Sequence, residues 1–161
     1  MLEKELIQIL SDELNILENL LSKEKEKKEA VISKEYSKLK KIDEEEKELL
    51  SKLEKLELER LNITKKLASK FSLEGEINLS KIIPFLNNQT TLIKLRDKLL
   101  LSLDEIRQAC LANKIIIESS ISVSLAVVEK ITNTTLSEVN YNSEGKKVFK
   151  DINITTYSTI S

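Results

Sequence analysis

The chain has 161 residues, of which 26 are Lys or Arg and 27 are Asp or Glu, with one cysteine and no histidine. Because the opposite charges are interleaved and nearly cancel, the chain offers no positive field for nucleic acid, and one cysteine excludes an intramolecular disulfide. The lack of histidine, of tryptophan and of a glycine-rich phosphate loop argues against an enzyme, a metal site or a bound cofactor.

The first expected helix runs from Leu2 to Val31. Its apolar face fades toward the charged run from Lys23 to Glu29. The residues of this face recur at helical spacing and are Leu6, Ile9, Leu10, Leu14, Leu17, Leu20 and Leu21. The start of the chain lacks the basic, apolar and small-residue segments of a secretory signal, so we expect a cytoplasmic protein.

The second expected helix begins near Ser33, a candidate cap, and ends at about Lys70. It carries a seam in which intervals of three and four residues alternate, which predicts a coiled coil. The seam consists of Leu39, Ile42, Glu46, Leu49, Leu53, Leu56, Arg60, Ile63 and Leu67. No Gly or Pro marks the break before it, so one continuous helix is an open alternative.

If the chain turns near Ser33, residues 1–70 form a long antiparallel helical hairpin, and facing residues have numbers that total about 68. Arg60 then lies near Asp12 and Glu13, and an ion pair with either of them would fix the hairpin register. The acidic cluster from Asp43 to Glu46 spreads around one helix, so it is interpreted as a solvated face rather than a metal site.

We expect residues 71–88 to form a connector with a short helical turn, in which Pro84 interrupts or opens an apolar stretch that starts at Ser80, and a third long helix to follow over residues 89–131. The stretch from Ile121 to Val128 also alternates like a strand, but we expect it to continue the helix. No transmembrane segment is expected, and residues 132–161 are expected to form a flexible tail. The expected fold class is therefore all-α: a coiled-coil hairpin, a third long C-terminal helix and a tail.

The third helix is apolar on more than one side between residues 115 and 131. One stripe contains Cys110, interpreted as a small core residue, and a second contains Ile116, Val123 and Val127. The excess apolar surface fits either a core helix or a helix that packs on one side and receives another protein on the other.

Three motifs follow one another along the chain. They are Leu50-x-x-Leu53-x-x-Leu56-Glu57-x-x-Arg60 after Glu45-Glu46-Lys47, then Asn113-x-x-Ile116-Ile117-Glu118, and then Tyr141-x-x-x-Gly145. In this order they resemble the FlgN family of flagellar export chaperones. The family often has a second Asn three residues before Asn113, where this chain has Cys110.

The resemblance implies a cytosolic helical chaperone for the C-terminal segments of the hook-filament junction proteins FlgK and FlgL. It also implies delivery to the flagellar type III export gate, where components of the export ATPase are further candidate partners. The client-binding residues that the resemblance implies are Asn113, Ile116, Ile117, Ser120, Val123 and Val127. Tyr141 and Gly145 would dock on the export gate.

Two other functions are compatible with the same pattern. One is a structural coiled coil that acts as a spacer or oligomerisation rod, and the other is a different coiled-coil component of the export apparatus. A rod would associate through the seam from Leu39 to Leu67 and would not need the C-terminal third.

Overall fold

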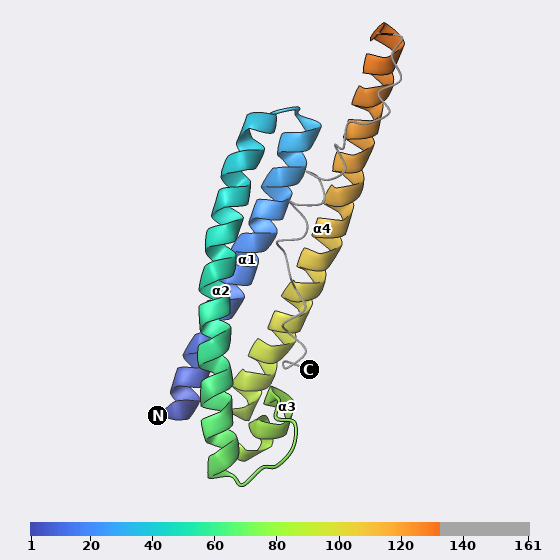
Figure 1. Ribbon diagram of the computed structural model, residues 1–161. Coiled ribbons are helices and arrows are strands. Elements are labelled where there is room, and N and C mark those ends of the chain that lie inside the picture. Colours follow the sequence, from blue (N-terminus) through green and yellow to red (C-terminus); the bar gives the residue numbers. More distant parts are fainter. Residues whose placement is uncertain (133–161) are drawn as a thin grey trace.

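The computed structural model describes residues 1–132, apart from the side chains of residues 124, 125 and 127–132. Three long helices, α1 (Leu2–Ile32), α2 (Tyr36–Lys70) and α4 (Gln89–Thr132), run along one another (Figure 1). The short helix α3 (Leu79–Ile82) and the 3-10 turn η1 (Ile83–Phe85) close one end. The expected all-α fold is confirmed, since residues 1–132 contain no strand.

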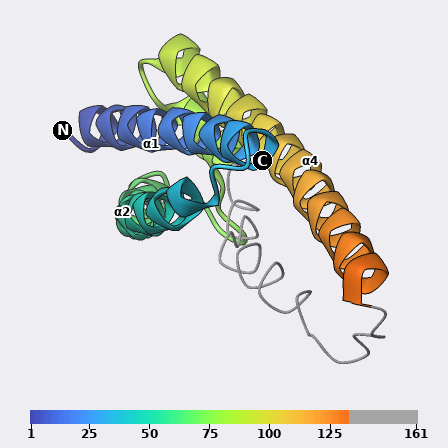
Figure 2. The ribbon, with the colours of Figure 1, turned by 90° about the horizontal axis from the view of Figure 1, so that it is seen from above.

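Helix α1 is the central helix of the molecule. It packs against α2, which runs antiparallel to it, and against α4, which runs parallel to it. Seen from above, α2 and α4 lie on different sides of α1 (Figure 2). A residue on α1 can therefore link the hairpin to α4.

The first two helices are separated by a turn at residues 33–35, so the alternative of one continuous helix is wrong. Ser33 closes α1, because its backbone N–H donates to the Glu29 carbonyl at 2.9 Å. Lys34 takes a left-handed backbone conformation with φ of 59°, and Glu35 is the residue that precedes α2. The expectation that Ser33 caps the second helix is therefore also wrong.

The hairpin is held by a seam in which buried charges replace apolar residues at two levels. Arg60 Nε lies 2.9 Å from Glu13 Oε1, and Lys27 Nζ lies 2.6 Å from Glu46 Oε2. The residue numbers of both pairs total 73, not the expected 68. In this register the first turn of α2 lies beyond the end of α1, in agreement with the exposure of Tyr36.

An apolar core fills the end of the molecule where α3 lies. Its fully buried members come from α1, α3 and α4, and they are Leu6, Leu10, Leu79, Ile82, Leu92 and Leu99. The rings of Phe71 and Phe85 stack with their centroids 5.4 Å apart and join the end of α2 to η1. This end is therefore packed by side chains from every helix of the described chain.

Glu3 connects the start of α1 to the start of α4. Its carboxylate accepts hydrogen bonds from the backbone N–H groups of Asn87 and Asn88 and from both of their side chains. Although burial opposes it, these bonds lower the pKa of Glu3. A carboxylate at a helix N-terminus also interacts favourably with the helix dipole. The contact fixes where α4 begins along α1.

Replacement of Arg60 by Leu is expected to destabilise the protein strongly, because the fully buried Glu13 would lose its ion partner. Breaking a buried pair by removing one partner costs about 3–5 kcal/mol. The combined change Arg60→Leu and Glu13→Leu should recover most of that loss, since two apolar groups would then face each other. Urea unfolding followed by circular dichroism measures both effects.

Lys66→Leu, which removes an exposed charge from the same helix, serves as the control and should change stability by less than about 0.5 kcal/mol. If the double variant is as unstable as Arg60→Leu alone, the loss of stability in Arg60→Leu does not come from the unpaired carboxylate of Glu13.

Candidate protein-binding surface

Helix α4 continues beyond the hairpin. Asn113 lies against Glu24, an offset of 89 residues, so the end of α1 at Ile32 is level with about residue 121 of α4. Figure 1 shows the last turns of α4 projecting past the turn of the hairpin. The hairpin therefore does not cover the last turns of α4.

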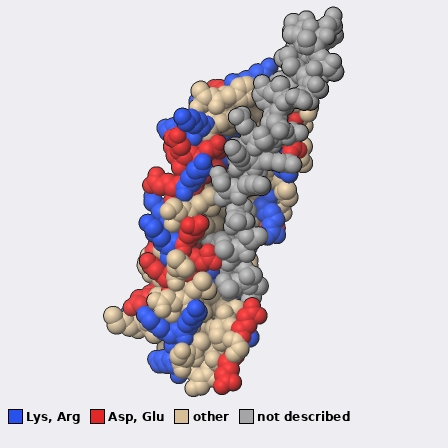
Figure 3. Space-filling model, viewed as in Figure 1, with Lys and Arg blue, Asp and Glu red and all other residues tan. Residues whose placement is uncertain are grey.

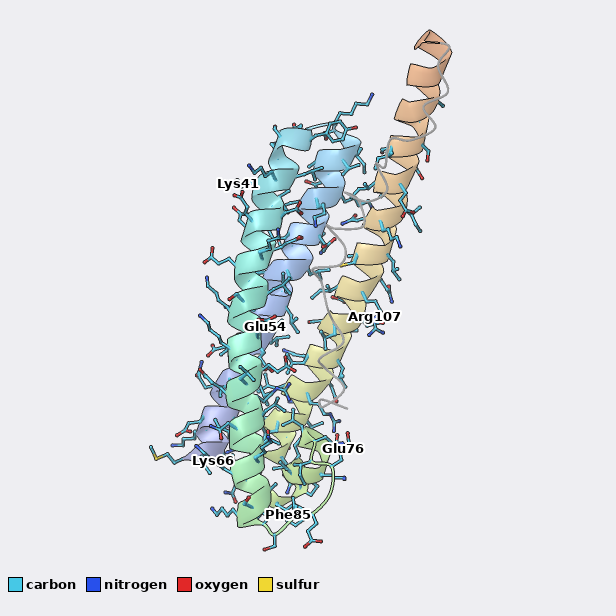
Figure 4. All side chains as sticks on the ribbon, in the orientation of Figure 1. Lys41, Glu54, Lys66, Glu76, Phe85 and Arg107 are labelled. Atoms are coloured by element: carbon cyan, nitrogen blue, oxygen red, sulfur yellow. The ribbon has the colours of Figure 1, made fainter. Side chains whose placement is uncertain are left out.

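Large apolar side chains are exposed along this half of α4. The exposed fractions are 56% for Leu111, 64% for Ile115 and 65% for Val123. Leu101, at 60%, is exposed in the first half of α4 as well, so exposed apolar side chains occur along much of the helix. Several of them on one helix are typical of a contact surface. Arg107, which also points to solvent, marks the start of this region in Figure 4. The hairpin differs, because its visible face carries alternating positive and negative side chains (Figure 3).

The structure distributes the expected client-binding residues over different environments. Ile116, Ile117 and Ser120 are partly exposed, and Val123 is open to solvent. Val127 lies on α4, but its side chain is outside the described part of the structure, as are Tyr141 and Gly145. Ile116, Val123 and Val127 are separated by seven and four residues and therefore lie on one side of the helix.

Asn113 does not belong to this exposed surface. Only 2% of it is accessible, and its side-chain Nδ2 donates to the backbone carbonyl and to the carboxylate of Glu24, both at 2.7 Å. A buried amide needs such partners, because leaving it unpaired is costly. In this structure the side chain of Asn113 therefore faces α1, and its expected contact with a client stays a prediction.

Behind Asn113, the ammonium of Lys27 is surrounded by three carboxylates. Its Nζ lies 2.6 Å from Glu46, 3.2 Å from Asp43 and 3.6 Å from Glu24. Lys27 is 1% exposed and Glu24 is 2% exposed. One positive charge cannot balance three negative charges at this depth, so the cluster favours an additional proton.

The pKa values of the cluster show where the proton is retained. Burial and the neighbouring Glu24 carboxylate raise the pKa of Glu46 to about 7, although Lys27 lowers it. Burial lowers the pKa of Lys27, but the surrounding carboxylates outweigh burial and raise it. Lys27 therefore remains charged near neutral pH, while Glu46 titrates there.

Cys110 adjoins the cluster from α4. Its thiol is partly buried, and burial, followed by the charge of Glu24, raises its pKa to about 12. A thiol that stays protonated is a poor nucleophile. Its environment is that of a small core residue and not that of a reactive thiol.

The burial of Glu24 and Lys27, and the pairing of the partly exposed Asp43 with Lys27, were not predicted from the sequence. The interpretation of the acidic cluster as solvated holds for Glu44, which is exposed, but is wrong for Asp43 and Glu46, which bind Lys27. A signal was present in α1, where intervals of three and four residues continue through the charged run. The buried positions with this spacing are Leu6, Leu10, Glu13, Leu17, Leu20, Glu24, Lys27 and Val31.

Within residues 1–132, no group of three or more His, Cys, Asp or Glu side chains is arranged to hold a metal ion. None of the helices in that range is both long and apolar enough to cross a membrane.

The stability of the protein is expected to fall as pH rises through the window from about 4.5 to 7. The native state holds a proton on Glu46 in that window whereas the unfolded chain does not, so unfolding releases a proton and becomes easier at higher pH. A shift of this size corresponds to about 3 kcal/mol. Glu46→Gln should flatten this part of the profile, which urea unfolding at a series of pH values measures.

The groups that face Glu46 are Lys27 and Glu24 on α1, Asp43 on α2 and Cys110 on α4. Glu44→Gln, an exposed neighbour, is the matched control and should leave the slope unchanged. Equal slopes for the native protein and Glu46→Gln would show that Glu46 does not hold the proton.

Comparison with known proteins identifies the family of the chain. The family described as FlgN protein matches residues 1–148, which include the hairpin, the connector and all of α4. No curated protein and no solved structure is significantly similar to the chain. Because the match covers most of the sequence, the chain belongs to the FlgN family of flagellar export chaperones.

Proposed function

We propose that this protein is a cytosolic chaperone that binds the C-terminal segments of FlgK-type and FlgL-type hook-filament junction proteins and delivers them to the type III export gate. The observation that supports this proposal is the exposed apolar surface of α4 between Leu111 and Val123. Family membership supplies the flagellar role, and the surface supplies a means of binding a protein.

An amphipathic helix of the client is the partner that this surface suits. Its apolar face would pack on Ile116, Val123 and Val127, with Ile117 and Ser120 at the margin, in the manner of a helix in a groove. Leu111 and Ile115 lie about 140° and 100° around α4 from Ile116, so they provide a second strip rather than part of the first. With two strips, one client helix could bind on either side of α4, or a longer client segment could contact both strips.

The affinity of such a contact is set by more than its area. A standard interface buries about 800 Å² on each partner, but much of the gain from apolar burial is spent on ordering the two partners. A client segment that folds only on binding adds to that cost. The proposed contact is therefore strong enough to prevent early assembly and weak enough to allow release.

The paired change Ile116→Asp and Val123→Asp is expected to weaken client binding by more than about tenfold, because burial of each apolar side chain is worth about 1.5–3 kcal/mol. Titration calorimetry against the C-terminal segments of the FlgK and FlgL homologues of the same organism measures this. The native chain should bind one segment per chain with saturation.

Leu58→Asp is the matched control, because Leu58 is 68% exposed but lies on α2. It should leave binding unchanged, and circular dichroism should show native helicity in every variant. No binding by the native chain would contradict the proposed function and favour a structural rod. Equal loss in the control and the paired variant would contradict the proposed surface.

Tyr141→Ala tests the proposed delivery step separately. We expect it to leave the affinity for the client segments within about twofold and to reduce export of the junction proteins severalfold, since a residue outside the proposed client surface contributes little to that contact. Secretion by cells that carry the variant measures export. Normal export with Tyr141→Ala, and also with Gly145→Ala, would contradict a docking role for this region.

A further inference from the structure

The packing of α4 against α1 changes character along the helix. In its first half the buried residues are apolar, and they are Leu92, Leu99, Leu103 and Ile106. From Arg107 to Val123, Asn113 is the only buried residue. The two halves are therefore attached to α1 by different kinds of interaction.

The second half is attached by the two hydrogen bonds from Asn113 to Glu24 and by the partial burial of Cys110 and Ile117. When α4 moves away, Asn113 can exchange these bonds for bonds to water, and the net cost of that exchange is small. Separation of the first half would instead expose Leu99, Leu103 and Ile106 to water, which nothing replaces. Opening is therefore easier in the second half.

We propose that the Glu24–Asn113 contact is a latch, and that the second half of α4 opens from α1 in the native protein while the first half remains packed. The anchor of the first half is continuous with the contact between Glu3 and the start of α4. Opening makes Cys110, Asn113 and Ile117 accessible in addition to the surface that is already exposed. This inference concerns the chain without any client and does not rest on the proposed function.

Cys110 is a built-in reporter of the latch. It is the only cysteine of the chain and lies one helical turn before Asn113. In the closed state its partial burial and raised pKa suppress reaction with a disulfide reagent. Its rate of labelling therefore measures how often the second half of α4 opens.

The experiment is the labelling of native full-length protein with the disulfide reagent DTNB, without denaturant. Asn113→Ala removes both hydrogen bonds and should accelerate labelling of Cys110 by at least about tenfold. The paired change Glu24→Leu and Asn113→Leu replaces both partners by apolar groups and should slow it by a similar factor. Leu111→Ala, an exposed change on the same helix, should have no effect.

Opening must also be distinguished from global unfolding. In a Cys110→Ser background, Leu99→Cys places the only thiol at a fully buried position of the first half. Its labelling should be at least about tenfold slower than that of Cys110, because only the second half opens locally. Equal labelling rates at the two positions, or a rate at Cys110 that does not change in either Asn113 variant, would overturn the proposal.

Discussion

Charge buried in the seam is the constraint on which the arrangement of the helices depends. Arg60 and Lys27 have no access to water, so each must meet a carboxylate at its own level of the neighbouring helix. A slip of one heptad would place Arg60 against Leu6 or Leu20, and it would place Lys27 against Leu39 or Leu53. Both slips would leave buried charges unpaired. The ion pairs thus penalise the wrong registers, a role that uniform apolar residues cannot fill, because every heptad of Leu resembles the next.

The same layer of charge also divides the molecule into two ends. Around α3 the core is apolar, draws on all the helices and fixes the start of α4 through Glu3. Toward the hairpin turn the interior is ionic and includes buried oxygen atoms, such as Glu24 Oε1 and Glu46 Oε1, that have no hydrogen-bond partner in the described structure. Unsatisfied polar groups reduce the gain from closing this end. Stability is therefore concentrated at the end opposite the proposed client surface.

Much of this fold could be predicted from the spacing of apolar residues. The features that could not be predicted are contacts between residues far apart in the sequence and buried positions occupied by residue types that are usually exposed. All nine positions of the α2 seam are buried or half-buried, because intervals of three and four residues define a helix face whatever the side chain. Lys27 also fits the spacing of three and four residues, but lysine is usually exposed on a helix, so its burial was not expected. The turn at Lys34 lacks the glycine that marks such turns, so the hairpin register was misplaced. The client-binding role of Asn113 was implied by the family resemblance alone, whereas its contact with Glu24 could not be predicted, because the two residues are 89 positions apart and no local pattern identifies such a partner.

These features have a common consequence for the proposed function, in which the protein holds a client and then releases it. An apolar seam along the whole of α4 would be more stable, but it would fix the helix to the hairpin and leave one rigid face to the client. A polar contact at Asn113 is specific, since an amide fits the carbonyl and carboxylate of Glu24 in one orientation, yet it adds little net stability. Because the contact between Asn113 and Glu24 is specific but weak, α4 can open and then return to the same closed position. In α4 the polar contact at Asn113 lies between the firmly packed first half and the exposed apolar side chains of the second half. This arrangement suits a helix that binds a client and releases it repeatedly, as proposed.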